Sequence, residues 1–305
     1  MLKAETATWF LKLSTTCVLI VTCCWVAPRV FSVPQFPPTT TDEQQFVVLS
    51  RYLELPMREI VLVGSSLTFR LREQFFAREN VRNVGLPGGE SVTGLAIIES
   101  DNARRPMIVS VETNVLTGEL DNDLLQKVIH RNRIGDALRP LRSLAAFYQS
   151  NLDLHQPRFD ADKRRAALAG PAVTYDNEKS IKQTLLQWNM PIYEKTVTKE
   201  ARAVKALVDE LEARGIIVFL YELPVPPVLA QSIYLETTRK ALTQVFARNN
   251  DRWLNLEYPP EELRWEDAIH LDERSAIIMS SSLEKAINEK MQARLKLEGV
   301  SIRRP

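Results

Sequence analysis

Short, largely apolar runs that alternate with longer helical segments are the feature that most constrains this fold. The runs lie at residues 60–63, 81–86, 107–111 and 216–220, with a fifth candidate at 253–256. Brief apolar runs bounded by turn residues are typical of parallel strands buried on both faces. Helical periodicity occurs at residues 42–53, 67–78, 91–100, 199–214, 228–248 and 273–297. The alternation predicts an α/β sandwich with a mostly parallel sheet of about five strands.

Several chemically useful residues follow these predicted strands. Ser66 comes after the first strand, Gly88 after the second and Asn114 after the third, and a Pro-rich loop at 223–227 follows the fourth. In an open parallel sheet, sites form beyond the carboxyl ends of the strands. We therefore expect these residues to lie along one edge of the sheet.

The N-terminal segment carries the signature of export. Residues 13–27 are apolar and uncharged, and Lys3 and Lys12 precede them. No Ala-x-Ala cleavage site follows, so we favour an uncleaved signal anchor over a cleaved signal peptide. Lipidation at Cys23 fits less well, because Thr22 stands where a small residue is expected. Residues 1–30 are thus assigned to this segment, and the remainder is expected on the extracytoplasmic, periplasmic side of the membrane, or secreted if cleavage occurs.

The amino-acid composition excludes some kinds of site in the rest of the chain. After a Pro-rich linker at residues 31–43, the domain at 44–305 contains no cysteine, because all three lie at positions 17, 23 and 24. A disulfide framework and a cysteine-based metal site are therefore excluded there. The 39 basic and 38 acidic residues leave a net charge of +1, which gives no indication of nucleic-acid binding.

A segment at about residues 121–198 breaks the alternation of strands and helices. We interpret it as an insertion over the active edge, either a lid or a substrate platform. A solvated helical hairpin packed on the sheet is the alternative. Its aromatic residues are either platforms for sugar rings or ordinary core residues, and we favour the core; they are Tyr175, Trp188 and Tyr193.

Three residues suggest nucleophilic catalysis. Ser66 stands in Gly-Ser-Ser-Leu-Thr at a strand-to-helix turn, and Asp267 and His270 lie three positions apart near the C-terminus. If they share one helical turn, the carboxylate can orient the imidazole while its other nitrogen takes a proton from the serine. The plain alternatives are a helix-capping serine, and an aspartate that caps the last helix beside a surface histidine. The remaining histidines, His130 and His155, fall in the insertion and are expected at the surface.

Two further residues fit an oxyanion hole. Gly88 ends the stretch Asn-Val-Gly-Leu-Pro-Gly and can offer its backbone N–H, while Asn114 can offer its side-chain amide. The alternative for Gly88 is a strand exit that needs a positive φ, and for Asn114 a turn residue. The backbone N–H of Ser66 completes the predicted set.

These four blocks, in this order, resemble those of the SGNH (GDSL-like) hydrolase superfamily. The Gly-Asp-Ser block of that family reads Gly-Ser-Ser here, the second-block glycine matches Gly88, and the Asp-x-x-His block is intact. The third block, usually Gly-x-Asn-Asp, reads Glu-Thr-Asn-Val, so Asn114 is kept and both flanking residues differ. The resemblance spans about residues 58–290, and the Gly-Ser-Ser variant is similar to membrane-anchored members that acylate envelope polymers.

The resemblance implies a flavodoxin-like, three-layer αβα sandwich, an acyl-enzyme on Ser66, and no metal or organic cofactor. The expected function is that of a serine esterase or O-acyltransferase acting on acyl, chiefly acetyl, esters of cell-envelope or exported carbohydrate. The alternative is a non-catalytic scaffold that binds polysaccharide or a membrane acyltransferase. A nucleotide-binding protein fits poorly, since no Gly-rich phosphate loop with lysine is present.

Overall fold

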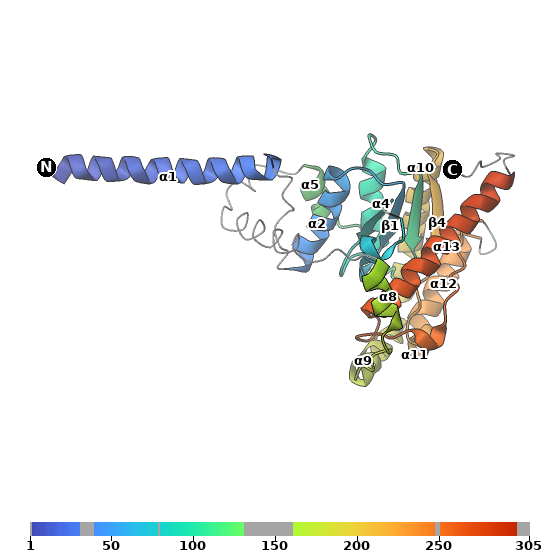
Figure 1. Ribbon diagram of the computed structural model, residues 1–305. Helices are drawn as coiled ribbons and strands as arrows, with labels where there is room; N and C mark the ends of the chain where they lie inside the picture. Colours follow the sequence, from blue (N-terminus) through green and yellow to red (C-terminus); the bar gives the residue numbers. More distant parts are fainter. Residues whose placement is uncertain (1, 31–39, 79, 131–160, 248–250, 298–305) are drawn as a thin grey trace. The chain divides into compact units, whose positions relative to one another are not determined.

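The computed structural model describes residues 2–30, 40–78, 80–130, 161–247 and 251–297 (Figure 1). The chain divides into two compact units, one made of residues 1–47 with 126–158 and the other of 48–125 with 159–305. Most of the predicted linker and the middle of the predicted insertion, residues 31–39 and 131–160, lie outside the described residues. The second unit holds the sheet and all predicted site residues.

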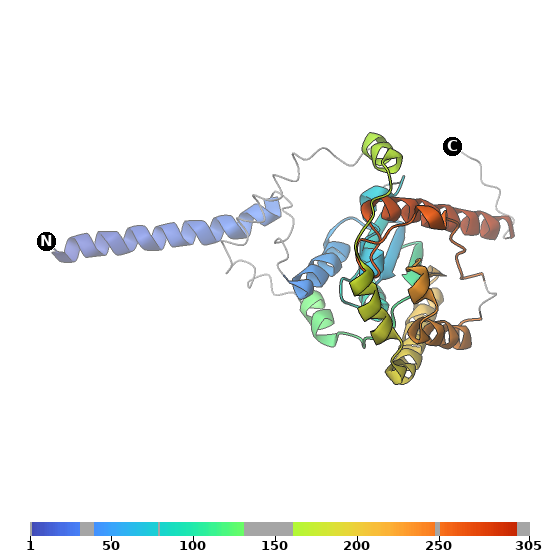
Figure 2. The ribbon, with the colours of Figure 1, turned by 90° about the horizontal axis from the view of Figure 1, so that it is seen from below.

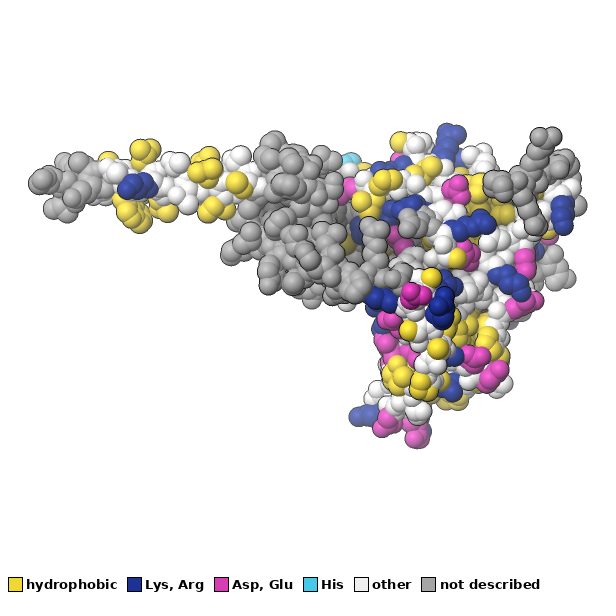
Figure 3. All heavy atoms as spheres, in the orientation of Figure 1, with side chains coloured by type: hydrophobic (Ala, Val, Ile, Leu, Met, Phe, Trp, Pro, Cys, Tyr) yellow, Lys and Arg dark blue, Asp and Glu magenta, His cyan; other side chains and the backbone are white. Residues whose placement is uncertain are grey.

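The first unit contains the N-terminal helix α1 (Leu2–Val30). Its segment Thr6–Cys23 has a mean hydropathy of 1.4 and buries none of its surface, and it is the one span in the described part of the chain that is long and apolar enough to cross a membrane. Figure 3 shows hydrophobic side chains exposed along this helix, and Trp9 is 62% exposed. The predicted apolar segment is therefore a helix, and its apolar surface continues before residue 13.

The second unit is built on a four-stranded parallel sheet with the order β2-β1-β3-β4. The strands are β1 (Ile60–Gly64), β2 (Val81–Gly85), β3 (Ile108–Glu112) and β4 (Ile217–Tyr221). The strands predicted at 60–63, 81–86, 107–111 and 216–220 are confirmed, each to within one residue. The predicted fifth strand is wrong, because Trp253 forms only an isolated bridge with Leu220. Pro259 and Pro260 follow shortly afterwards, and proline cannot extend a strand ladder.

Helices cover the sheet, and strand side chains alternate between two sets of helical partners. Ile60 and Leu62 belong to a core shared with Ile277 and Leu283 of α13 (Glu273–Leu297). Figure 2 shows α13 running along one side of the strands. Val63 points instead toward Gly94 of α4 (Ser91–Ser100), which packs with α10 (Glu194–Ala213). This α/β arrangement is compatible with the predicted three-layer sandwich.

Two predicted helices are shorter than their periodicity suggests. The helix expected at 67–78 is a single turn, α3 (Ser66–Phe69), followed by the 3-10 turn η1 (Glu73–Phe75). It ends because Asn83 Nδ2 binds the carbonyls of Thr68 and Leu71, each at 2.7 Å. The helix expected at 228–248 is split into α11 (Pro227–Ala230) and α12 (Ile233–Val245), and Ser232 caps the second piece.

The remaining described helices match or extend the predicted pattern. Helix α2 (Thr41–Glu54), α4 and α13 lie where helical periodicity is found, and α10 begins before the predicted 199. The described parts of the insertion contain α5 (Asn122–Ile129), α8 (Ala161–Ala169), α9 (Glu178–Trp188) and the 3-10 turn η2 (Pro191–Tyr193), and a further 3-10 turn, η3 (Pro260–Glu262), precedes the Asp267 loop. Helix α8 packs on α13, and α9 packs on α11 and α12.

Candidate active site

The site includes the turn between β1 and α3, where two adjacent serines have different structural roles. Ser65 is buried, and its hydroxyl accepts the backbone N–H of Leu67 at 3.2 Å, so it is the N-cap of the short helix. Ser66 is only partly buried and does not serve as the cap. The capping role weighed for Ser66 therefore falls to its neighbour, and the Ser66 hydroxyl faces the loop before α13.

Ser66, His270 and Asp267 form one continuous hydrogen-bonded array. His270 Nε2 lies 2.8 Å from Ser66 Oγ, and His270 Nδ1 lies 2.7 Å from Asp267 Oδ2. The serine and histidine are 204 residues apart in sequence, so the fold alone brings them together. A carboxylate on one imidazole nitrogen and a hydroxyl on the other is the geometry of a serine nucleophile with its general base.

The Asp267–His270 pair is held by a bend and not by the helical turn that the spacing suggested. Asp267 Oδ1 accepts the backbone N–H groups of Ile269 at 2.9 Å and His270 at 2.8 Å. This aspartate turn places both side chains on one side without a helix. The cap of α13 is provided by Asp272, whose side chain accepts the N–H of Ser275 at 2.8 Å, so Asp267 is free for the histidine.

The electrostatics of the pair favour an ionised Asp267. Burial acts to raise the pKa of the Asp267 carboxyl, but hydrogen bonds from the His270 ring and from two backbone N–H groups outweigh it and hold that pKa well below its ordinary value. An ionised carboxylate beside Nδ1 favours the imidazole tautomer that carries its proton on Nδ1. Nε2 then carries the lone pair that faces the Ser66 hydroxyl.

The loop after β2 leaves the sheet beside the Ser65–Ser66 turn. Gly85 pairs with Gly64 in the parallel register, and Leu86 donates its N–H to Gly64 O at 2.9 Å. Gly88 follows in a tight turn with φ of 64°, a conformation that glycine adopts without strain. The positive φ weighed for this position is therefore present, and Gly88 lies in a loop that leaves the same sheet edge as Ser66.

Asn114 is placed differently from a free oxyanion donor. Its side chain is fully buried, its Nδ2 donates to Leu223 O at 2.8 Å, and its Oδ1 accepts the N–H of Leu223 at 2.7 Å. The pair joins the loops after β3 and β4 at the site edge. A donor role for Asn114 depends on its second amide hydrogen, because the first is bound to the Leu223 carbonyl.

Sequence reasoning missed a residue that connects the insertion to the Asp267 loop. Asn177, immediately before α9, donates from Nδ2 to the carbonyls of Trp265 and Asp267, each at 2.9 Å. An isolated asparagine before a helix carries no signal beyond capping, and here its side chain does not cap. The described end of the insertion thus contacts the loop that presents Asp267 and His270.

Two aromatic residues of the insertion, Trp188 and Tyr193, are half-buried and pack against a buried ring. The rings of Trp188 and Tyr193 lie 5.2 and 5.1 Å from the ring of Tyr234, which is buried in α12. This favours the core interpretation over a sugar platform for these two residues. Of the other histidines, His130 is exposed, and His155 lies outside the described residues.

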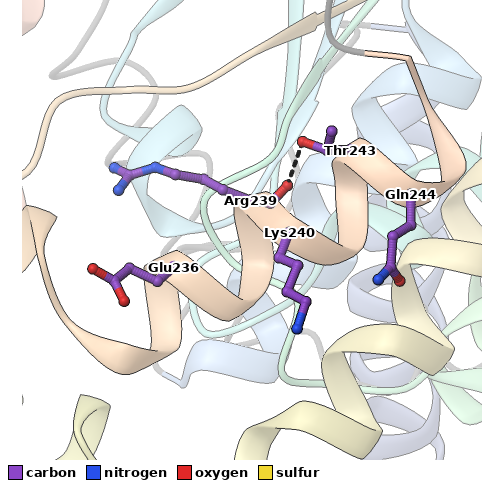
Figure 4. A pocket seen from close by; sticks show the side chains of 5 residues that line it. All are labelled: Glu236, Arg239, Lys240, Thr243 and Gln244. Carbon is purple, nitrogen blue, oxygen red and sulfur yellow. Dashed lines mark hydrogen bonds between the residues drawn. The ribbon is translucent and has the colours of Figure 1, made fainter.

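A separate surface hollow lies on α12 (Figure 4). Five side chains of that single helix line it, and none of them belongs to the Ser66 array; they are Glu236, Arg239, Lys240, Thr243 and Gln244. Arg239 is already paired with Glu222. One helix surface without converging polar groups from other elements does not make a ligand site.

No family model, no curated protein and no solved structure matches this chain. The resemblance to SGNH hydrolases therefore rests on the four sequence blocks.

Proposed function

We propose that this protein is a serine esterase or O-acyltransferase that acts on acyl esters, chiefly acetyl esters, of cell-envelope or exported carbohydrate. The observation that carries the proposal is the array from Ser66 Oγ through His270 to Asp267, with heavy-atom distances of 2.8 and 2.7 Å. Such distances are within the range that direct proton transfer requires.

The reaction proceeds through an acyl-enzyme. Ser66 Oγ attacks the ester carbonyl carbon while His270 Nε2 takes the hydroxyl proton, which gives a tetrahedral oxyanion. The intermediate collapses, the C–O bond to the leaving alcohol breaks, and His270 returns the proton to that alcohol. Water or a sugar hydroxyl then attacks the acyl-Ser66 ester with the same base. Water gives hydrolysis, and a sugar hydroxyl gives transfer.

The oxyanion is held by donors at the ends of β1 and β2. The backbone N–H groups of Ser66 and Gly88 are the principal candidates, because both belong to turns at the same sheet edge. Asn114 joins them through its second amide hydrogen. This division predicts that Asn114 contributes less than the two backbone groups, since Leu223 holds its side chain.

The N-terminal helix is relevant to the cellular compartment in which the proposed reaction would occur. A span of 18 residues near the N-terminus with a mean hydropathy of 1.4 supports a signal anchor, and with such an anchor we expect the second unit to lie outside the cytoplasm. We propose acylated envelope or exported carbohydrate as the ester class that it meets there, and a membrane acyltransferase as a candidate partner. Nucleic acid is not a partner in this proposal.

Acetyl release and acetyl transfer, measured with the detergent-solubilised full chain, test the proposal. An O-acetylated polysaccharide and 4-nitrophenyl acetate serve as donors and an unacetylated oligosaccharide as acceptor. We expect free acetate or acetylated oligosaccharide, and we expect both products to vanish in Ser66→Ala and His270→Ala. His130→Ala, at an exposed histidine, is the matched control and keeps the parental rate.

Turnover that survives Ser66→Ala would contradict an acyl-enzyme on this residue. Absence of any turnover by a folded parent, together with saturable binding of the polysaccharide, would instead support the non-catalytic scaffold.

A further inference from the structure

A fully buried carboxyl group lies behind the nucleophile turn. Glu112 is the last residue of β3, and its Oε2 accepts three hydrogen bonds from that turn. The donors are the Ser65 backbone N–H at 2.8 Å, the Ser65 hydroxyl at 2.7 Å and the Thr68 hydroxyl at 3.1 Å. A buried polar or charged group that accepts three hydrogen bonds from one turn strongly restrains the position of that turn.

The direction of each proton in this network follows from its neighbours. Thr68 gives its single hydroxyl proton to Glu112, so Tyr221 must donate to Thr68 across their 2.7 Å contact. Ser65 likewise donates to Glu112 and accepts from Leu67. The Ser65 backbone N–H and the hydroxyls of Ser65 and Thr68 therefore all point toward one carboxyl oxygen, while Tyr221 supports Thr68 from β4.

The packing around Gly64 also indicates that the Glu112 carboxyl group lies directly against the turn. A Cβ at this position would lie 2.1 Å from Thr68 Oγ1 and 2.6 Å from Glu112 Oε2. The residue before the two serines must therefore lack a side chain so that the carboxyl group can reach the turn. Ser65 and Glu112, both departures from the SGNH blocks, are the two residues that the 2.7 Å hydrogen bond joins.

The second carboxyl oxygen, Oε1, is buried and has no hydrogen-bond partner among the described residues. Burial raises the pKa of the Glu112 carboxyl above its usual range. Because all three hydrogen bonds converge on Oε2, a proton on Oε1 leaves them intact. The network therefore holds the turn in both protonation states, and the acceptor geometry matters more than the charge.

We propose that Glu112 is a positioning residue that holds the Ser65–Ser66 turn so that Ser66 Oγ stays aimed at His270 Nε2. This inference rests on the proposed function, because it concerns the same nucleophile. Misplacement of a reacting group by about 1 Å can cost about 100-fold in rate. Loss of the Glu112 acceptor should therefore slow reactions of Ser66 without removing any group of the array itself.

The test compares inactivation by a fluorophosphonate across full-chain variants, with the maximal inactivation rate separated from the apparent probe affinity. Glu112→Leu keeps the volume but removes the acceptor, and we expect about a 100-fold lower maximal rate with unchanged probe affinity. Glu112→Gln keeps an acceptor oxygen and should stay within about 5-fold of the parent. Ser110→Ala is the matched control, two residues earlier on the same strand, with a buried hydroxyl for which the described part of the chain offers no hydrogen-bond partner.

The outcomes separate this inference from the proposed function. A parent that is never labelled contradicts the proposed function itself. A labelled parent with an equally fast, folded Glu112→Leu variant overturns the inference, and so does a Gln variant as slow as the Leu variant. If Glu112→Leu does not fold, Ser65→Ala decides, because it removes one of the three donors; we expect about a 10-fold slower rate, and an unchanged rate overturns the inference.

Discussion

Replacement of Asp267 by asparagine tests the orientation of the imidazole without removing the loop. Asp267 Oδ1 accepts two backbone N–H groups, from Ile269 and His270, and an asparagine oxygen can accept both. The asparagine nitrogen then takes the place of Oδ2, 2.7 Å from His270 Nδ1. Two donors cannot face each other there, so the ring must carry its proton on Nε2. Nε2 can then no longer accept the Ser66 proton.

The size of the expected loss follows from this change of tautomer. In serine hydrolases such an exchange costs up to about 10⁴-fold in turnover. The Asp267 side chain is 45% exposed, so water can partly replace the lost orientation. We therefore expect the lower part of the range, about 10³-fold in kcat/KM, which corresponds to about 4 kcal/mol of transition-state stabilisation.

The assay is hydrolysis of 4-nitrophenyl acetate by the full chain, with thermal unfolding recorded for each variant. Glu266→Gln is the matched control, since it exchanges the same groups one residue away in a surface ion pair with Arg70. It should remain within about 2-fold of the parent. An Asp267→Asn variant that keeps more than a tenth of the parental kcat/KM would refute the assigned role of this carboxylate.

Three further predictions concern stability. Burial raises the pKa of Glu90 from 4.5 to about 7, so the folded state retains a proton that the unfolded chain loses, and the free energy of unfolding should fall as pH rises between these values. Glu90→Gln should remove about 3 kcal/mol of that fall, measured by chemical denaturation at several pH values. If the free energy of unfolding of the variant fell with pH as steeply as that of the parent, the prediction would be wrong. Gly85→Ala should cost about 2–3 kcal/mol, because the new Cβ would lie 2.4 Å from a backbone nitrogen. At Gly170 a new Cβ would make only ordinary contacts, 3.7 Å from two carbonyl oxygens, so Gly170→Ala should be nearly neutral, and equal effects of the two substitutions would contradict the packing. Asn177→Ala loses two hydrogen bonds and should lower the free energy of unfolding by about 1–3 kcal/mol. It should also speed proteolysis after residue 160, and equal digestion rates of the variant and the parent would disprove this prediction.

The sheet was predictable from sequence because its strands are short, apolar and buried on both faces. Positions 60–63 and 216–220 show this pattern without interruption, and both are strands to within a residue. The lengths of the helices were not predictable from the sequence, because tertiary contacts override helical periodicity. The turn after Ser66 ends when Asn83 takes two of its carbonyls, and nothing in local sequence announces a hydrogen bond from the next strand.

That Ser66, Asp267 and His270 lie together was predictable, but the contacts that hold them in place were not, and their catalytic role stays a prediction. Ser66, Asp267 and His270 stood out because their chemistry and their places relative to the strands agreed. The sequence could not tell which of two adjacent serines caps the helix, nor that a bend replaces a helical turn at Asp267. Glu112 gave no signal, because a glutamate at a strand end is normally read as a surface residue.

The most direct test of the account is covalent labelling of the full chain by a fluorophosphonate, with intact mass and peptide mapping. The account predicts a single adduct, located on Ser66, that is absent from Ser66→Ala. No adduct on a folded parent, or an adduct that persists in Ser66→Ala, would contradict an activated serine at this position.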